Sequence, residues 1–197
     1  MRWLTLYARS RQVPASLAAV LISAVVVWAL ADGGGGEPGK SGSAALVVVT
    51  GAMVASIGFA GQDLALDRTA AIRWTARRAG HVLLAGAVVA AAPLGARTLG
   101  EDLATAEFIV RDSAGLMGLA ALGAVVCGRQ YAWTLPVGWF MIAYFAPPAT
   151  STTGTTSTPM ELATWMLLPP DATTGIWSAA VLAVAGTVTY AVAGPRR

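Results

Sequence analysis

The residues with the most scope for chemistry are an arginine and an aspartate, Arg111 and Asp112, which lie inside an otherwise apolar run. A charge in such a place is costly, and it usually has a function. One function is structural: Arg111 can pair with Glu107, four residues earlier on a helix, or extend toward the membrane surface. The other is a substrate path that both charges face. The sequence leaves both functions open.

The other reactive side chains occur singly. Cys127 is the only cysteine and His81 the only histidine, so the chain can form neither an internal disulfide nor a metal site of several thiolates or imidazoles. We expect Cys127 to be a small apolar residue within a membrane helix and His81 to lie at a membrane interface. The sequence contains no phosphate-binding loop, nucleophile elbow or zinc-protease motif. We therefore predict that the chain is not an enzyme and holds no cofactor or metal.

Composition places these residues in a membrane protein. The chain is 56% hydrophobic and 12% charged, whereas soluble domains are roughly half apolar and about a quarter charged. The net charge of +3 does not indicate nucleic-acid binding, because the basic residues are scattered at the ends of apolar runs. We predict an all-α integral membrane protein in contact with the lipid bilayer and with no nucleic-acid partner.

Six apolar runs within one transmembrane domain, residues 1–197, are about long enough to cross a bilayer core of roughly 30 Å. These predicted spans are 14–31, 44–61, 80–96, 108–127, 131–146 and 175–193. Residues 1–13 have an apolar arc at helical spacing, which predicts an amphipathic helix in the membrane interface. A secretory signal is the alternative for the first run, because Ala29-Leu30-Ala31 has the form of a cleavage site.

The basic residues predict the orientation of the six spans. With both termini cytoplasmic, the outer side holds Lys40, Arg97 and Arg111 alone, and the remaining basic residues lie inside. Those inside are Arg2, Arg9, Arg11, Arg68, Arg73, Arg77, Arg78, Arg129, Arg196 and Arg197. Arginine-rich short loops stay in the cytoplasm. We therefore predict a multi-pass protein of the plasma membrane.

Two segments between the spans stand out. Segment 62–78 is the longest charged stretch, and on the cytoplasmic side it offers a contact for a soluble protein. Between the fifth and sixth spans, Thr158 and Glu161 form a capping-box pattern, with Pro159 at the first helical position. The helix that they start, 159–168, includes Trp165 and is stopped by two prolines. It is too short to cross, so it is either re-entrant or lies in the outer interface.

Small residues spaced four apart predict places where helices approach closely. They are Gly51 with Ala55, Gly86 with Ala90, and Ala120 with Ala124 and Gly128.

This order of elements resembles the membrane subunit of type-two ABC exporters, in the small stand-alone form whose ATPase is a separate polypeptide. The resemblance implies two copies of this permease, or one copy and a homologous permease subunit, on two ATPases that hold the ATP and Mg. It also implies that segment 62–78 contains the coupling helix, with Asp63, Asp67 and Arg68 at the ATPase contact. Helix 159–168 would match the extracellular re-entrant helix.

Segment 62–78 departs from a simple coupling helix, because Leu64, Ile72 and Trp74 point in different directions on one continuous helix. Either the helix breaks near Thr69, or the segment is a solvated basic loop that only sets the topology. The rival functional class is a non-transporting membrane protein, an accessory, immunity or anchoring subunit that binds a partner and moves no substrate.

Overall fold

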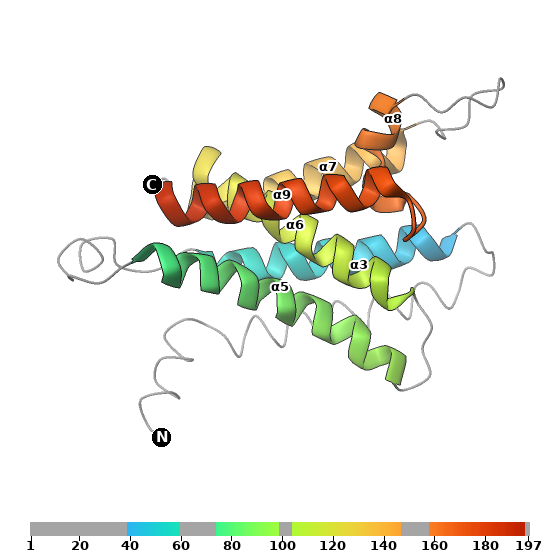
Figure 1. Ribbon diagram of the computed structural model, residues 1–197, viewed down its shortest axis with the longest axis horizontal. Helices are drawn as coiled ribbons and strands as arrows, with labels where there is room; N and C mark the ends of the chain where they lie inside the picture. The colour runs from blue at the N-terminus through green and yellow to red at the C-terminus, as the bar shows by residue number, and fades with distance from the viewer. Residues whose placement is uncertain (1–38, 60–73, 99–103, 147–157, 196–197) are drawn as a thin grey trace.

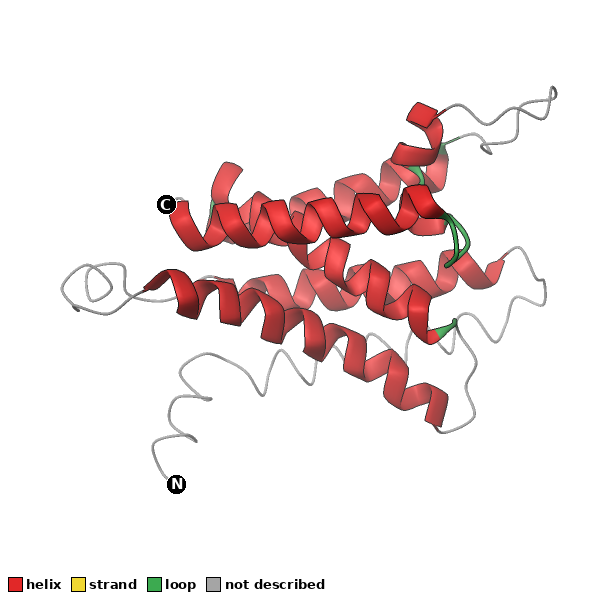
Figure 2. Ribbon diagram, in the orientation of Figure 1, coloured by secondary structure: helices red, strands yellow, loops and turns green. Residues whose placement is uncertain are grey.

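The computed structural model describes residues 39–59, 74–98, 104–146 and 158–195, and this part of the chain is helical, without a β-strand (Figure 2). Three predictions lie outside the described residues. They are the interfacial helix 1–13, the first span 14–31, and most of segment 62–78, with Asp63, Asp67 and Arg68.

Four long helices correspond to four of the predicted spans. They are α3 (Gly39–Ser56), α5 (Trp74–Thr98), α6 (Ala106–Val126) and α9 (Thr173–Ala193). Each contains or overlaps a stretch that is long and apolar enough to cross a membrane. The described chain is thus all-helical, and these apolar helices suit it to a lipid bilayer, as an integral membrane protein requires.

The fifth predicted span, 131–146, forms a shorter helix than the sequence suggested. A 3-10 turn, η2 (Arg129–Tyr131), precedes α7 (Thr134–Phe145), which has 12 residues. At 1.5 Å per residue this helix is about 18 Å long, against a hydrocarbon core of about 30 Å. The α7 helix does not cross a bilayer by itself, so a fifth crossing stays a prediction.

The helices alternate in direction along the bundle (Figure 1). The first residues of α3, α6 and α9 lie at one end, on the right of the figure, whereas α5 and α7 run the opposite way. This end also holds the short helix α8 (Thr158–Ala163), and we call it the α8 end. The other end we call the basic end, because it carries Arg77, Arg78 and Arg129.

The most buried of the long helices is α6, which packs against α3, α5, α7 and α9. Its contact with α9 is close because glycines face each other there. A Cβ added to Gly118 would overlap the carbonyl of Leu182, and one added to Gly186 would overlap the carbonyl of Gly118. The pattern of small residues four apart predicted a close helix contact at Gly51, and Gly51 does lie against Val89 on α5. The same pattern did not select Gly118 and Gly186, which form the closer contact between α6 and α9.

Near the basic end an aromatic contact joins three segments. Phe59 in η1 (Ile57–Phe59) is buried between His81 of α5 and Tyr190 of α9, with ring centroids 5.6 Å and 4.9 Å away. His81 is therefore part of a packed contact in the second turn of α5. Cys127 was expected to be a small apolar residue within a membrane helix; it is the exposed C-cap of α6, which ends at Val126.

The predicted helix 159–168 is split into two short pieces. After α8 the chain breaks at Thr164, whose hydroxyl donates back to the Met160 carbonyl at 2.8 Å, and continues as η3 (Trp165–Leu167). Leu168 is extended, with φ −70° and ψ 153°. This conformation is the one that a residue before proline favours, so Pro169 ends the helix as predicted.

Candidate functional site

The candidate site is the buried pair Arg111 and Asp112, near the start of α6. Thr105 caps this helix, because its hydroxyl accepts a hydrogen bond from the Phe108 backbone N–H at 3.3 Å. The helix therefore begins at Ala106, which places Arg111 more than one turn inside it. The side chains of Arg111 and Asp112 are 6% and 0% exposed, so both charges are removed from solvent.

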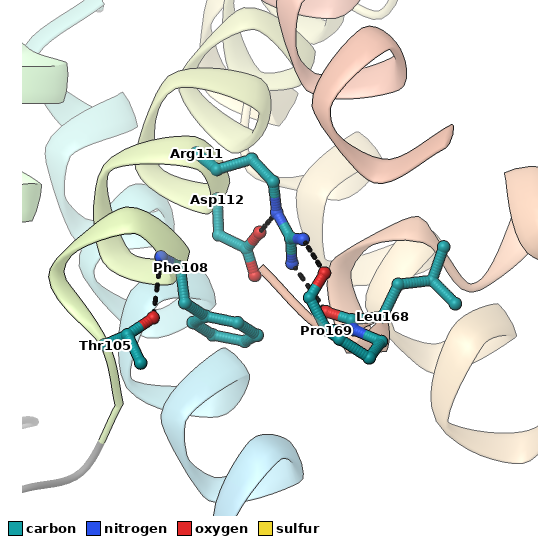
Figure 3. Close-up of polar contacts among 6 residues, drawn as sticks. All are labelled: Thr105, Phe108, Arg111, Asp112, Leu168 and Pro169. Atoms are coloured by element: carbon teal, nitrogen blue, oxygen red, sulfur yellow. Dashed lines mark hydrogen bonds and ion pairs between the residues drawn. The ribbon is translucent and has the colours of Figure 1, made fainter. Parts of the chain in front are cut away.

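The guanidinium of Arg111 makes three polar contacts in the plane of its fork (Figure 3). Nε lies 2.8 Å from Asp112 Oδ1, Nη1 donates to the Pro169 carbonyl at 2.7 Å, and Nη2 donates to the Leu168 carbonyl at 3.0 Å. The guanidinium carbon also lies 5.0 Å from the centre of the Phe108 ring. Arg111 therefore pairs with Asp112 and not with Glu107, the partner that helical spacing suggested. Glu107 is exposed.

The carbonyls of Leu168 and Pro169 follow the last turn of η3, where carbonyls have no partner within the helix. The Pro169 carbonyl also accepts a hydrogen bond from the Ala172 N–H at 3.1 Å, whereas Arg111 is the donor to the Leu168 carbonyl. Pro169 and Pro170 have no N–H, and they stop the helix from continuing. The planar fork of an arginine reaches both carbonyls and a carboxylate at once, which a lysine ammonium does not. Arg111 therefore joins α6 to the segment that leads from η3 into α9.

Two glycines make room for this arrangement. A Cβ on Gly175, in the first turn of α9, would lie 3.0 Å from Arg111 Nη1 and 3.2 Å from the Trp165 carbonyl. A Cβ on Gly115 would meet the Trp165 ring at 2.5 Å. Trp165 and Met166 are fully buried as a result. Sequence reasoning selected Trp165 but not the glycines, because glycines in apolar helices carry no local signal of the partner that they admit.

The other predicted residues of the short helix tie it to its neighbours. Glu161 accepts a hydrogen bond from the Thr174 hydroxyl of α9 at 2.9 Å. The indole N–H of Trp139, on α7, donates to the Ala163 carbonyl at 3.1 Å. Pro159 is exposed at the start of α8. Contacts with α6, α7 and α9 thus hold the two short pieces at the α8 end.

Three buried polar atoms at the site have no hydrogen-bond partner among the residues that the structure describes. They are Asp112 Oδ2, the hydroxyl oxygen of Ser113 and Trp165 Nε1. Within the same residues, no group of three or more histidine, cysteine, aspartate or glutamate side chains could hold a metal ion. The arrangement can hold two segments together through charge, and it offers one unused carboxylate oxygen inside the bundle.

The site brings together only part of what the sequence singled out. Arg111 pairs with Asp112, and Trp165 lies next to Arg111 around Gly175, whereas Glu161 and Pro159 lie on the neighbouring piece α8. Comparison with protein-family models, with curated proteins and with solved structures gave no match.

Proposed function

We propose that this chain is the membrane-spanning subunit of an ATP-driven exporter of the plasma membrane. It forms the translocation path as a dimer, with a second copy or a homologous permease subunit. A separate ABC-type ATPase carries the ATP and Mg and couples to the chain through segment 62–78. This chain itself contributes no catalytic residue and no cofactor.

The observation that carries this proposal is the way α8 and η3 are held. They lie between α7 and α9, Trp165 and Met166 are buried, and Arg111 binds the two carbonyls that follow η3. A helical element that returns into the bundle between the last two spans is the feature that the exporter resemblance implies at this place. A loop that merely connects two spans has no need of a buried charge pair.

The charges at the two ends support the orientation that the proposal requires. The acidic residues of the described chain lie toward the α8 end; they are Glu107, Asp112, Glu161 and Asp171. Among the described residues, the basic end carries Arg77, Arg78 and Arg129, and the α8 end carries Lys40, Arg97 and Arg111. In the sequence, Arg68 and Arg73 precede α5, and Arg196 and Arg197 follow α9, so the segments joined to the basic end hold most of the arginines. Because arginine-rich segments remain inside, the basic end faces the cytoplasm and α8 faces outward. Segment 62–78 enters α5 at the basic end, where a cytoplasmic ATPase can reach it.

The test is coupled hydrolysis with the full chain. The tagged protein is purified from its own membranes, and ATPase activity is measured in liposomes with Asp67→Ala and Arg68→Ala. If these charges are desolvated at the contact, each substitution weakens binding by roughly 2–5 kcal/mol; at an exposed rim the loss is under about 1 kcal/mol. Arg77→Ala is the matched control, because Arg77 lies in the first turn of α5, nearer the membrane, and is not one of the proposed contact residues Asp63, Asp67 and Arg68.

We expect an ATPase to co-purify and the two variants to lose coupling while the control keeps it. Purified protein without associated ATPase activity would favour the accessory, immunity or anchoring subunit. If an ATPase is associated and both Asp67→Ala and Arg68→Ala keep wild-type coupling, segment 62–78 is a basic loop that only sets the topology.

A further inference from the structure

A cavity of about 370 Å³ lies beside the site, between α7, α8, η3 and α9. Three indole rings from three different elements contribute to its wall, those of Trp139, Trp165 and Trp177. An apolar cavity of about 150 Å³ holds one benzene molecule. This larger cavity therefore has room for two aromatic rings.

The interior of the cavity is apolar because the polar groups of its wall do not face it. The Thr174 hydroxyl and the Trp139 N–H each donate a hydrogen bond to a neighbouring residue, at 2.9 Å and 3.1 Å. The Ser178 hydroxyl and the Trp165 N–H are buried away from the cavity surface. A charged ligand would lose its hydration here and gain no polar partner. The cavity therefore suits an uncharged ligand.

The mouth of the cavity opens sideways, toward the lipid. Leu162, Trp177 and Val181 line the cavity and are at the same time exposed on the surface. Trp177 and Val181 belong to α9, which is long and apolar enough to cross a membrane. The exposed face of α9 continues beyond them with Val184 and Val188. A ligand therefore enters from the bilayer, where it competes with acyl chains.

This competition favours rings over chains. Lipid tails are as apolar as leucine side chains, so a hydrocarbon that moves from the bilayer into the cavity gains no hydrophobic free energy. What the cavity adds is contact with indole rings. Aromatic pairs, whether offset-stacked or edge-to-face, gain affinity beyond the area that they bury, about two- to tenfold for each pair. A rigid ring system also loses less conformational freedom on binding than a flexible acyl chain.

The indole rings of the wall are available for such pairs. Among the described residues, the ring pairs join phenylalanine, tyrosine and histidine side chains, and none includes these three tryptophans. Two of the rings are held in place by the fold. Trp165 is fully buried against Gly115, and the Trp139 N–H is bound to the Ala163 carbonyl. Rings that are already ordered lower the entropy cost of binding a ligand.

We propose that this cavity binds an uncharged, rigid molecule with two aromatic rings, which reaches it from the bilayer. The acyl chain of a lipid is the competitor that such a molecule displaces. The site stands on the cavity and its indole rings, so it holds whether or not the chain belongs to an exporter.

The experiment uses the full chain in nanodiscs of phosphatidylcholine and a biphenyl that carries a photoreactive diazirine. Adducts at Trp139 and Leu182, which line the cavity and are only partly exposed, are mapped by mass spectrometry. They are normalised to adducts at the lipid-exposed residues Leu83 and Leu84 of α5. The measurement involves neither ATP nor export, so its outcome is independent of the proposed function.

Three unlabelled hydrocarbons with the same number of carbon atoms compete with the probe, at equal concentrations in the bilayer. Biphenyl has two aromatic rings, bicyclohexyl has the same two-ring skeleton without aromaticity, and dodecane is a flexible chain. We expect biphenyl to displace the probe from the cavity about two- to tenfold better than bicyclohexyl, the gain of one aromatic pair, and dodecane to be the weakest competitor.

Matched tryptophan variants locate the effect. Trp177→Leu removes one ring from the cavity wall at a position that is 67% exposed, so the bundle keeps its packing. It should reduce the advantage of biphenyl over bicyclohexyl. Trp133→Leu should leave this advantage unchanged, because Trp133 is also exposed but lies outside the cavity.

Three results would each overturn the proposal. The first is that cavity adducts are no more frequent than those on α5. The second is equal competition by the three hydrocarbons, which would make a lipid acyl chain the occupant. The third is an equal advantage of biphenyl in the two tryptophan variants.

Discussion

Replacing Arg111 by alanine should release η3 from the end of the bundle. The substitution removes the partner of Asp112, whose side chain is completely buried, and the guanidinium donors to the carbonyls of Leu168 and Pro169. The short pieces α8 and η3 then keep the apolar contacts of Trp165 and the hydrogen bonds that join Thr174 to Glu161 and Trp139 to Ala163.

The size of the effect follows from the burial of the pair. Removing one partner of a buried ion pair costs roughly 3–5 kcal/mol, and the Leu168 carbonyl, left without its donor, costs about 1–3 kcal/mol; the Pro169 carbonyl keeps the Ala172 N–H. These costs overlap, because Asp112 can take up a proton and water can enter the vacated space. We expect a net loss of about 3–5 kcal/mol in the free energy of unfolding. Arg111→Lys should lose less, since the charge remains but one ammonium cannot reach all three acceptors.

A double variant separates a structural pair from a functional one. Arg111→Met with Asp112→Leu removes both charges and keeps an apolar volume, a change that is often neutral or stabilising when a buried pair is purely structural. If the double variant is stable and still exports, the pair only holds η3. If it is stable and inactive, the charges face the translocated substrate.

Two measurements check the prediction. The free energy of unfolding is followed by circular dichroism during denaturation in mixed micelles. The local release is followed with Met166→Cys in a Cys127→Ala background, because Met166 is fully buried and the introduced thiol should react with maleimide only when η3 detaches. If that thiol stays protected when Arg111→Ala is added, and the free energy of unfolding is unchanged, the role of Arg111 as a clamp is refuted.

Two further predictions concern packing and orientation. Gly118→Ala should push α6 away from α9, because the new Cβ would overlap the Leu182 carbonyl, and should lower the thermal midpoint of unfolding; Gly80→Ala, with open space around it, should be neutral or stabilising by up to about 1 kcal/mol. Two exposed positions, Cys127 and Asp171, can be used to measure the orientation of the helices across the membrane. In intact cells an impermeant maleimide should leave native Cys127 unlabelled and should label Asp171→Cys in the Cys127→Ala protein; the reverse pattern would invert the topology.

The sequence by itself determined the class of this protein and most of its helices. Apolar runs near 20 residues predict membrane helices locally, because an isolated span satisfies its own backbone groups. Four predicted spans are accordingly helices in the structure. The stop at Pro169 and the start near Pro159 also follow from local chemistry, since proline lacks an N–H and fixes its backbone.

Only the tertiary structure decided what the charged and small residues contact. Helical spacing suggested Glu107 as the partner of Arg111. Besides Asp112, however, the guanidinium binds two backbone carbonyls that are 57 and 58 residues away in the sequence. Likewise, the close crossing of α6 and α9 depends on Gly118 and Gly186 facing each other. A cavity between α7, η3 and α9 is lined by three tryptophans, Trp139, Trp165 and Trp177, one from each of these elements. Such contacts join residues far apart in the chain, and no local spacing carries that information.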